Sequence, residues 1–142
     1  MQRDEPLTDE DRRPWLERIR DLAAREASED RNAVVTCSCL KKAYRDLVRG
    51  AKAAAPSGDV PTGKLRPGAV EGLRFVHLAI DPETAQDRVG DRRGHYFDEA
   101  LVASQFEALE PPRRALTLDA TRPVEELVDA AVAGLGLAEP RN

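Results

Sequence analysis

The stretch Leu73-Arg-Phe-Val-His-Leu-Ala-Ile80 runs directly into Asp81 and Pro82, and this junction decides the fold. A short apolar run rich in β-branched and aromatic residues is typical of a strand buried in a parallel sheet. Aspartate can cap the free N–H groups of a helix start, and proline fits the first helical position. The junction therefore predicts a buried strand over 73–80, followed by a helix that ends near Val89.

The same alternation of strand and helix continues upstream. Residues 33–37 (AVVTC) are short, β-branched and apolar, and they predict another buried strand. Ser38 can cap a following helix from about Cys39 to Arg49, and Gly50 is a typical helix stop. At the N-terminal end, Thr8 predicts the cap of a further helix.

Pro14 either breaks the first turn of that N-terminal helix or opens its main part. The apolar residues that follow at helical spacing predict a buried face and an end near residues 30–32. These are Leu16, Ile19, Leu22 and Ala23.

Downstream, Asp98 predicts the cap of a helix that ends at two prolines, and residues 116–119 predict a third short strand. Pro123 opens the last helix. The inward-facing residues predicted for these two helices are Leu101, Val102, Phe106, Leu109, Val124, Leu127, Val128, Ala131, Val132 and Leu135. Alternating strands and helices predict an α/β fold of three layers, with parallel strands flanked by helices.

The whole chain has 142 residues, which predicts one domain, and residues 51–72 are rich in proline and glycine and predict a flexible insertion loop. The net charge of -4 argues against a nucleic-acid-binding protein, and no apolar run is long enough to span a membrane. Cys37 and Cys39 are too close for an ordinary disulfide, so we expect free thiols in a reducing cytoplasm, with no metal bound.

The segment after residues 33–37 is the first candidate for a binding site, because ligands of open α/β sheets bind at the carboxyl ends of strands. Lys41 and Arg45 are four residues apart and share a helix face, with Tyr44 beside them. Two cations and a phenol could hold a carboxylate and several hydroxyls. The alternative is a solvated basic helix face on which Lys42 pairs with Asp46, and the pattern alone favours this alternative.

The loop that follows the helix over 82–89 is the second candidate. Arg88 and Arg92 are four residues apart, and flanking glycines would let the loop close over phosphates. An exposed basic turn explains the pattern equally well, and His95 alone says little. Residues 58–65 (GDVPTGKL) nearly spell a phosphate-binding loop, but no strand precedes them and Leu65 replaces the required hydroxyl, so we reject that match.

Four ordered motifs give the chain a resemblance to the gluconate kinase family of P-loop kinases. Residues 5–16 (EPLTDEDRRPWL) resemble the family's PL-[N/T]-D-x-D-R-x-P-W-L, and residues 37–46 (CSCLKKAYRD) resemble its CSALKxxYRD, with Cys39 in place of the usual alanine. Residues 92–97 (RRGHYF) are similar to its lid motif RKGHF, and residues 104–112 (SQFEALEPP) to its SQFxxLEPP.

The resemblance implies an ATP- and Mg²⁺-dependent transfer of the γ-phosphoryl group to the 6-hydroxyl of D-gluconate by a cytoplasmic homodimer. It places Lys41, Tyr44, Arg45 and His95 at the substrate, and Arg88 and Arg92 at the nucleotide or in the lid. In the family, a glycine-rich phosphate loop lies between two strands that precede the first motif, and here Met1 stands just before that motif. We therefore expect a partial kinase domain over 1–142 that lacks the first two strands and is inactive alone.

Two alternatives stay open on the sequence alone. One is a non-catalytic scaffold or dimerisation module derived from a small-molecule kinase. The other is a kinase of the same fold for a different substrate, such as shikimate. The motifs over 37–46 and 104–112 argue against the second.

In the family's sheet order, the first strand would lie between residues 33–37 and 73–80, so both segments would lose a neighbour. We therefore expect this chain to be unstable or to associate through exposed edges.

Overall fold

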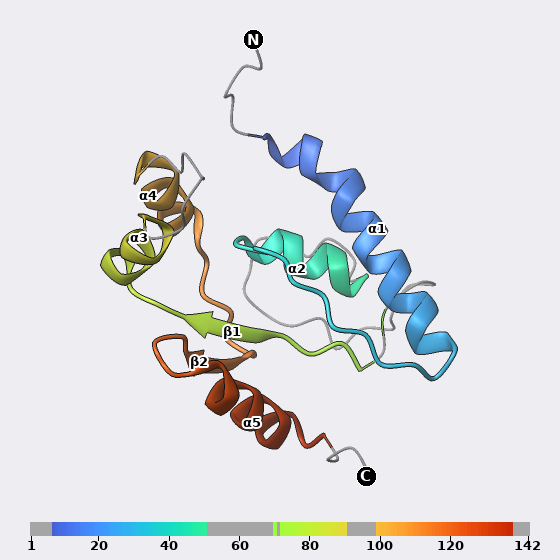
Figure 1. The fold of residues 1–142 in the computed structure, drawn as a ribbon. Coiled ribbons are helices and arrows are strands. Elements are labelled where there is room, and N and C mark those ends of the chain that lie inside the picture. Colours follow the sequence, from blue (N-terminus) through green and yellow to red (C-terminus); the bar gives the residue numbers. More distant parts are fainter. Residues whose placement is uncertain (1–6, 51–69, 71, 91–98, 138–142) are drawn as a thin grey trace. The chain divides into compact units, whose positions relative to one another are not determined.

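The computed structural model describes residues 7–50, 70, 72–90 and 99–137 (Figure 1). They belong to two compact units, Met1–Leu73 and Arg74–Asn142, and each unit is described by itself. The predicted insertion over 51–72 lies almost wholly outside the described residues, as do the lid motif and the Asp98 cap. The prediction of a single domain over 1–142 stays a prediction.

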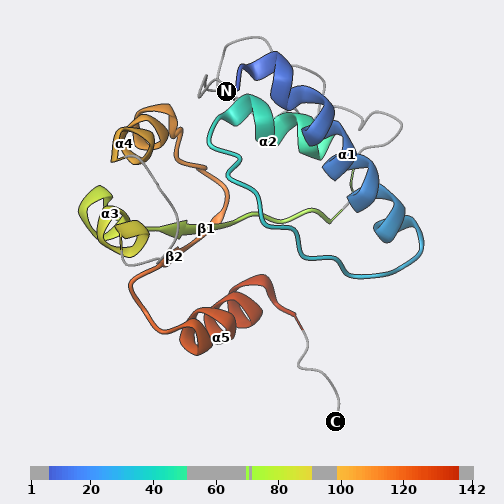
Figure 2. The ribbon, with the colours of Figure 1, turned by 45° about the horizontal axis from the view of Figure 1, so that its top comes forward.

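Unit 1 is built on two helices that pack side by side, α1 (Asp9–Ser28) and α2 (Lys42–Arg49) (Figure 2). Its core is formed by Leu16 of α1 with Tyr44 and Val48 of α2, which are all buried. The loop between the helices contributes Cys37 and Cys39 to the edge of this core. The packing therefore fixes the start of α2 against the first half of α1.

Local chemistry sets the ends of these helices. The Thr8 hydroxyl accepts from the backbone N–H of Asp11, and the Asp11 carboxylate accepts in return from the N–H of Thr8, so the predicted cap is a complete capping box. Gly50 ends α2 with a φ of 70°, as predicted, because glycine adopts this left-handed conformation without steric cost.

Three predictions for unit 1 are wrong. Residues 33–37 form no strand, and Val34 is 96% exposed, because a strand needs a hydrogen-bonded neighbour and none of the described residues provides one. Helix α2 begins at Lys42 instead of Cys39, because Cys39 has a φ of 34° that no right-handed helix accommodates. Helix α1 continues through Pro14 at the cost of the helical hydrogen bond that its missing N–H would have donated to the carbonyl of Glu10.

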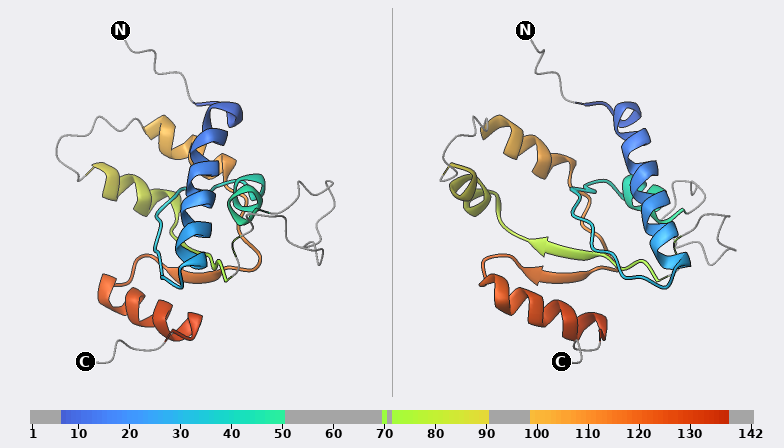
Figure 3. Two further views of the ribbon diagram at one scale, coloured as in Figure 1. Left: turned by 90° about the vertical axis from the view of Figure 1, so that its right-hand side faces the viewer. Right: turned by 45° about the vertical axis from the view of Figure 1, so that its right-hand side comes forward.

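Unit 2 contains two parallel strands, β1 (Val76–Ala79) and β2 (Leu116–Asp119), in the register Val76 to Leu116 and Leu78 to Leu118. Helices α3 (Pro82–Gly90) and α4 (Glu99–Ala108) pack against each other, and α5 (Val124–Leu135) packs against β2. Figure 3 shows β2 lying between β1 and α5. The predicted α/β class with parallel strands is therefore confirmed for the part of the chain that the structure describes.

The junction that decides the fold is formed as predicted at the start of α3, whereas the strand before it is shorter than the predicted 73–80. Asp81 caps α3 by accepting from the backbone N–H of Thr84 at 2.8 Å and from its hydroxyl at 2.7 Å. Gly134 lets α5 approach the sheet, because a Cβ atom at that position would lie 2.7 Å from a methyl carbon of Leu116. None of the helices in the described ranges is long and apolar enough to cross a membrane.

The predicted burial in unit 2 is only partly correct. Strand β1 alternates between exposed and half-buried residues instead of being buried, and Leu78 is 53% exposed. Val102 of α4 is buried as predicted, whereas Leu101, Val124 and Val128 are exposed. With two strands in the described sheet, too little surface is available to cover every apolar face.

Candidate functional site

The candidate site lies where the first turn of α1 meets the start of α2. The capping box begins α1 at Asp9, and the shared core of Leu16, Tyr44 and Val48 holds the two helices together. Asp9 and Lys41 are 32 residues apart in the sequence, yet packing brings them into contact. The site is therefore a product of tertiary structure, although Asp9 and Lys41 each sit at a helix terminus.

An ionic cluster of Asp9, Lys41 and Tyr44 forms the polar part of the site. The Lys41 ammonium donates to both carboxylate oxygens of Asp9, at 2.7 and 2.8 Å, and the Tyr44 hydroxyl also donates to Asp9. The Lys41 Nζ atom lies 5.5 Å from the centre of the Tyr44 ring, and the Arg12 guanidinium carbon lies 6.0 Å from it. Two cations therefore flank one phenol ring, a favourable cation–π arrangement.

The cluster changes the protonation of its members in a consistent direction. The hydrogen bond from Lys41, followed by that from Tyr44, lowers the pKa of Asp9 below its ordinary value of 3.8. The same contact with Asp9 raises the pKa of Lys41. Burial, and then the hydrogen bond to Asp9, raises the pKa of Tyr44. At neutral pH the site therefore holds a carboxylate, an ammonium and an un-ionised phenol.

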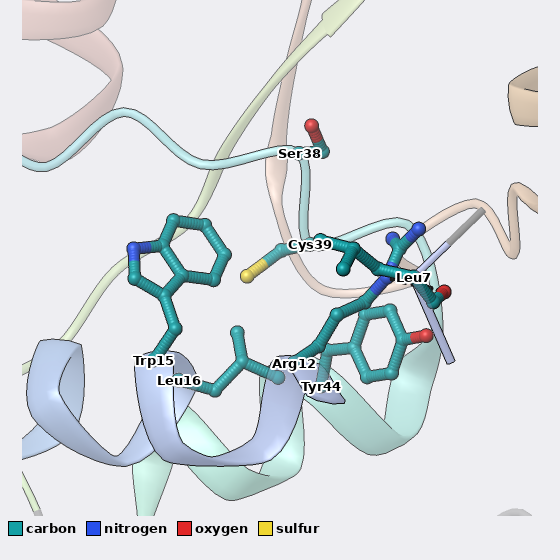
Figure 4. Close-up of a pocket in the computed structure, with 7 residues that line it drawn as sticks. All are labelled: Leu7, Arg12, Trp15, Leu16, Ser38, Cys39 and Tyr44. Atoms are coloured by element: carbon teal, nitrogen blue, oxygen red, sulfur yellow. Dashed lines mark hydrogen bonds between the residues drawn. The ribbon is translucent and has the colours of Figure 1, made fainter. Parts of the chain in front are cut away.

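A pocket of about 400 Å³ opens beside this cluster (Figure 4). Its lining combines apolar side chains with a guanidinium, a hydroxyl, a thiol and a phenol: Leu7, Arg12, Trp15, Leu16, Ser38, Cys39 and Tyr44. Arg12 is held in place by its Nε atom, which donates to the carbonyl of Leu7 at 3.2 Å. A volume in this range suits a small organic ligand, and a few polar groups on an apolar wall can orient it.

The structure places the predicted substrate residues in different roles. Lys41 and Tyr44 are brought together in the cluster. Arg45 is buried, and its guanidinium donates to the carbonyls of Cys39 and Leu40 at 2.8 and 2.9 Å, so it braces the loop that forms one pocket wall. The proposed contact of Arg45 with substrate stays a prediction.

The predicted lid residues are only partly described. Arg88 lies in α3 of unit 2 and donates to the carbonyl of Ala120 at 2.7 Å. Arg92 and His95 lie outside the described residues. The predicted closing of the loop at Arg88 and Arg92 over phosphates therefore stays a prediction.

Two residues of the site, Asp9 and Arg12, were not among the predicted site residues. Periodicity cannot find them, because their partners belong to another helix. The available signal was the motif over residues 5–16, which contains both. Among the residues described, no group of three or more His, Cys, Asp or Glu side chains is arranged to hold a metal ion.

Comparison with known proteins identifies similar kinases. The chain is 40% identical over 108 residues to a probable gluconokinase of Rattus norvegicus, a match that covers 75% of this chain and 58% of the rat protein. It is 32% identical over 132 residues to a probable gluconokinase of Xenopus tropicalis, covering 90% of this chain and 67% of that protein. No protein-family model matches the chain.

A solved sugar kinase of Janibacter sp. HTCC2649 is similar in structure, with a TM-score of 0.73 and 33% sequence identity. The match covers 97% of this chain and 71% of that one. The chain thus spans roughly three fifths to seven tenths of the length of these relatives.

Proposed function

Since the chain belongs to the gluconokinase family, we propose that it takes part in the ATP-dependent phosphorylation of D-gluconate to 6-phospho-D-gluconate. Within that reaction, unit 1 binds the sugar acid. The observation that supports this role is the cluster of Asp9, Lys41 and Tyr44 beside the pocket that Arg12 lines.

The chemistry of this site suits an open-chain sugar acid. Gluconate carries one carboxylate and five hydroxyl groups. Arg12 and Lys41 supply N–H donors for the carboxylate, whereas the Asp9 carboxylate accepts hydrogen bonds from hydroxyl groups. Trp15 and Leu16 offer apolar surface to the carbon chain. The ligand carboxylate competes with Asp9 for Lys41, so binding replaces the ion pair between Lys41 and Asp9 with one between Lys41 and the ligand.

Arg45 and the lid arginines complete the proposed arrangement. Arg45 acts on the substrate through the loop that it braces, because its hydrogen bonds to Cys39 and Leu40 fix the backbone beside the pocket. Arg88 and Arg92 serve the nucleotide phosphates, where arginines offset charge that develops in phosphoryl transfer. The resemblance assigns His95 to the substrate.

ATP and Mg²⁺ belong to the proposed reaction through the family. Among the described residues, no group of three or more His, Cys, Asp or Glu side chains could hold a metal ion. Mg²⁺ is often held largely by the phosphates of the nucleotide with one or two carboxylates. We further propose a cytoplasmic location, which agrees with the two free cysteines, and a homodimer.

Titration of the chain with gluconate tests the proposal through Trp15, the single tryptophan, which is 49% exposed and lines the pocket. We expect a saturable change in tryptophan emission with gluconate. Glucose lacks the carboxylate and should give at most a weak response. Formation of 6-phosphogluconate is measured in parallel with ATP and Mg²⁺.

The two measurements separate the parts of the proposal. Gluconate binding that excludes glucose and shikimate supports the sugar-acid site, and product formation supports the complete reaction. Equal responses to gluconate and glucose would contradict the assigned role of Arg12 and Lys41. Preferential binding of shikimate would replace the substrate and keep the kinase class.

A further inference from the structure

The loop between α1 and α2 contains a pair of thiols that the proposed kinase reaction does not use. The Sγ atoms of Cys37 and Cys39 lie 3.2 Å apart, which is direct contact between two sulfur atoms, and neither cysteine is in a disulfide. Both residues are half-buried at the edge of the unit 1 core. The pair is therefore close enough to react with itself, yet remains reachable from solvent.

The backbone holds the two sulfur atoms in this arrangement. Cys39 has a φ of 34°, in the left-handed region of the backbone that residues other than glycine and asparagine rarely adopt. This conformation brings the second thiol back towards the first across a single intervening residue. The guanidinium of Arg45 holds the carbonyls of Cys39 and Leu40 at 2.8 and 2.9 Å, and so keeps the loop in this shape.

We propose that Cys37 and Cys39 form a reversible redox site, in which a small-molecule disulfide such as oxidised glutathione converts the two thiols into an intra-loop disulfide. The sulfur atoms must approach by about 1 Å to reach disulfide bonding distance, which a loop segment can supply. A ring closed over one intervening residue is strained. Strained disulfides are the easily reduced ones, so the bond suits a reversible role.

The reaction balances in two exchange steps. The Cys37 thiolate attacks one sulfur of oxidised glutathione, which forms a mixed disulfide and releases one glutathione. The Cys39 sulfur then attacks the Cys37 sulfur, closes the ring and releases the second glutathione. Two electrons leave the protein thiols and reduce the small disulfide, and the two protein protons end on the two released thiols.

The environment of Cys39 is compatible with Cys37 attacking first. Burial, and then the hydrogen bond and charge of Cys37, raise the pKa of the Cys39 thiol to about 12. Cys39 is therefore protonated at neutral pH, so little of it is present as the attacking thiolate. In the mixed disulfide Cys37 has no thiol left to ionise, so its charge no longer opposes ionisation of Cys39. Burial still raises the pKa of Cys39, and the charge of Arg45 lowers it.

Oxidation would also alter the pocket. Cys39 lines it, and Figure 4 shows its sulfur pointing towards the ring of Trp15, above Leu16. Ring closure pulls this sulfur towards Cys37 and changes the wall that faces Trp15. Emission from this single tryptophan therefore reports the redox state without any substrate.

The test incubates the full chain in glutathione buffers of increasing oxidised fraction, blocks remaining thiols with N-ethylmaleimide, and measures intact mass. We expect the reduced protein to take two labels. The oxidised protein should take none, carry no glutathione and be lighter than the reduced, unlabelled chain by two hydrogen atoms. Dithiothreitol should restore both labels, and Trp15 emission should follow the same transition.

Cys39→Ala is the matched control, because it removes the closing thiol and keeps the attacking one. This variant should stop at the mixed disulfide with one glutathione attached, and its emission should not follow the wild-type transition. Stable glutathione adducts on the wild type, disulfides between chains, or two reactive thiols in fully oxidised buffer would each overturn the proposal. Ring closure without a change in Trp15 emission would overturn its effect on the pocket.

Discussion

Among the individual side chains of the candidate site, Lys41 contacts both Asp9 and Tyr44. Its ammonium contacts both oxygens of Asp9 and faces the Tyr44 ring, whereas the neighbouring Lys42 pairs with Asp46 at 2.5 Å, one helical turn further on. Two adjacent lysines thus have separate partners. This pair of neighbours gives the proposed function an internal control.

Replacing Lys41 with methionine should weaken gluconate binding by roughly 10- to 100-fold, because a hydrogen bond between charged groups contributes about 1.5–3 kcal/mol. Lys42→Met should change the dissociation constant by less than about twofold, since exposed ion pairs on a helix contribute little. Fluorescence titration of both variants checks the prediction. Equal losses in the two variants would show that general positive charge, and not the Lys41 contact, attracts the ligand.

The lowered pKa of Asp9 gives stability a defined pH dependence. Because the carboxylate is favoured in the folded state, its stabilising effect is present above the ordinary value of 3.8 and is lost as the pH falls through the lowered value. The difference in unfolding free energy between the wild type and Asp9→Asn should therefore be constant above about pH 5 and shrink towards zero in stronger acid.

Urea unfolding at a series of pH values measures this difference. The hydrogen bond from Lys41 is the largest cause of the lowered pKa of Asp9. In a protein that carries Lys41→Met, replacing Asp9 with Asn should therefore change the pH dependence of the unfolding free energy less than it does in the wild type. An undiminished change in that protein would assign the effect to Tyr44 or Arg12 instead.

The sequence predicted two of the three members of the ionic cluster and missed Asp9, together with Arg12 of the pocket. Lys41 and Tyr44 were predictable because both lie at the start of one helix, although Lys41 forms its N-cap with extended backbone instead of its first turn. Asp9 and Arg12 were not, because their contacts depend on how α1 packs against α2. The buried position of Arg45 was equally inaccessible, since only the left-handed turn at Cys39 directs the carbonyls towards its guanidinium.

At the level of helices and strands, local hydrogen bonding explains which boundaries were predictable. Thr8, Asp81 and Gly50 act through atoms within a few residues, so their types alone located the helix ends correctly. The strand predicted over 33–37 needed a distant partner, and the pattern of apolar residues contains no information on whether one is present. Helix ends that depend on contacts within one turn can therefore be predicted from sequence, whereas the pairing of a strand with a distant strand cannot.

The capping box of α1 makes a direct prediction about stability. Thr8→Ala removes the hydroxyl that accepts from Asp11, and should lower the free energy of unfolding by about 1 kcal/mol. Thr8→Ser keeps a hydroxyl at the same place and should lose much less. Chemical denaturation of the two variants decides the matter, and equal losses would mean that the threonine methyl group, rather than the cap, stabilises this end.

At the scale of the whole molecule, strand β1 has one neighbouring strand in the described sheet and exposes apolar side chains. In the described sheet, β1 pairs with β2 on one side, and Val76 and Leu78 are 37% and 53% exposed. Such an edge offers unpaired N–H and C=O groups to another strand. We therefore expect copies of this chain to associate through β1, and a monomer that melts cooperatively would count against this expectation.

Leu78→Lys should weaken that association by about tenfold or more, because a charged side chain on an edge strand opposes further pairing. Val124→Lys changes a residue that is 70% exposed on α5, away from the strand edge, and should leave association unchanged. Light scattering across a concentration series measures both. If the α5 variant alone becomes monomeric, association proceeds through the helix instead.

The proline within α1 has a consequence for how this helix opens. Pro14 has no N–H, so the hydrogen bond that would tie it to the carbonyl of Glu10 is missing. That bond would have joined the turn that carries Asp9 and Arg12 to the turn that carries Leu16. Deuterium uptake should accordingly be rapid in the first turn of α1 and slow beyond Leu16, so the first turn behaves as a separate cooperative unit. Gluconate bound at the proposed site should slow the uptake of that turn.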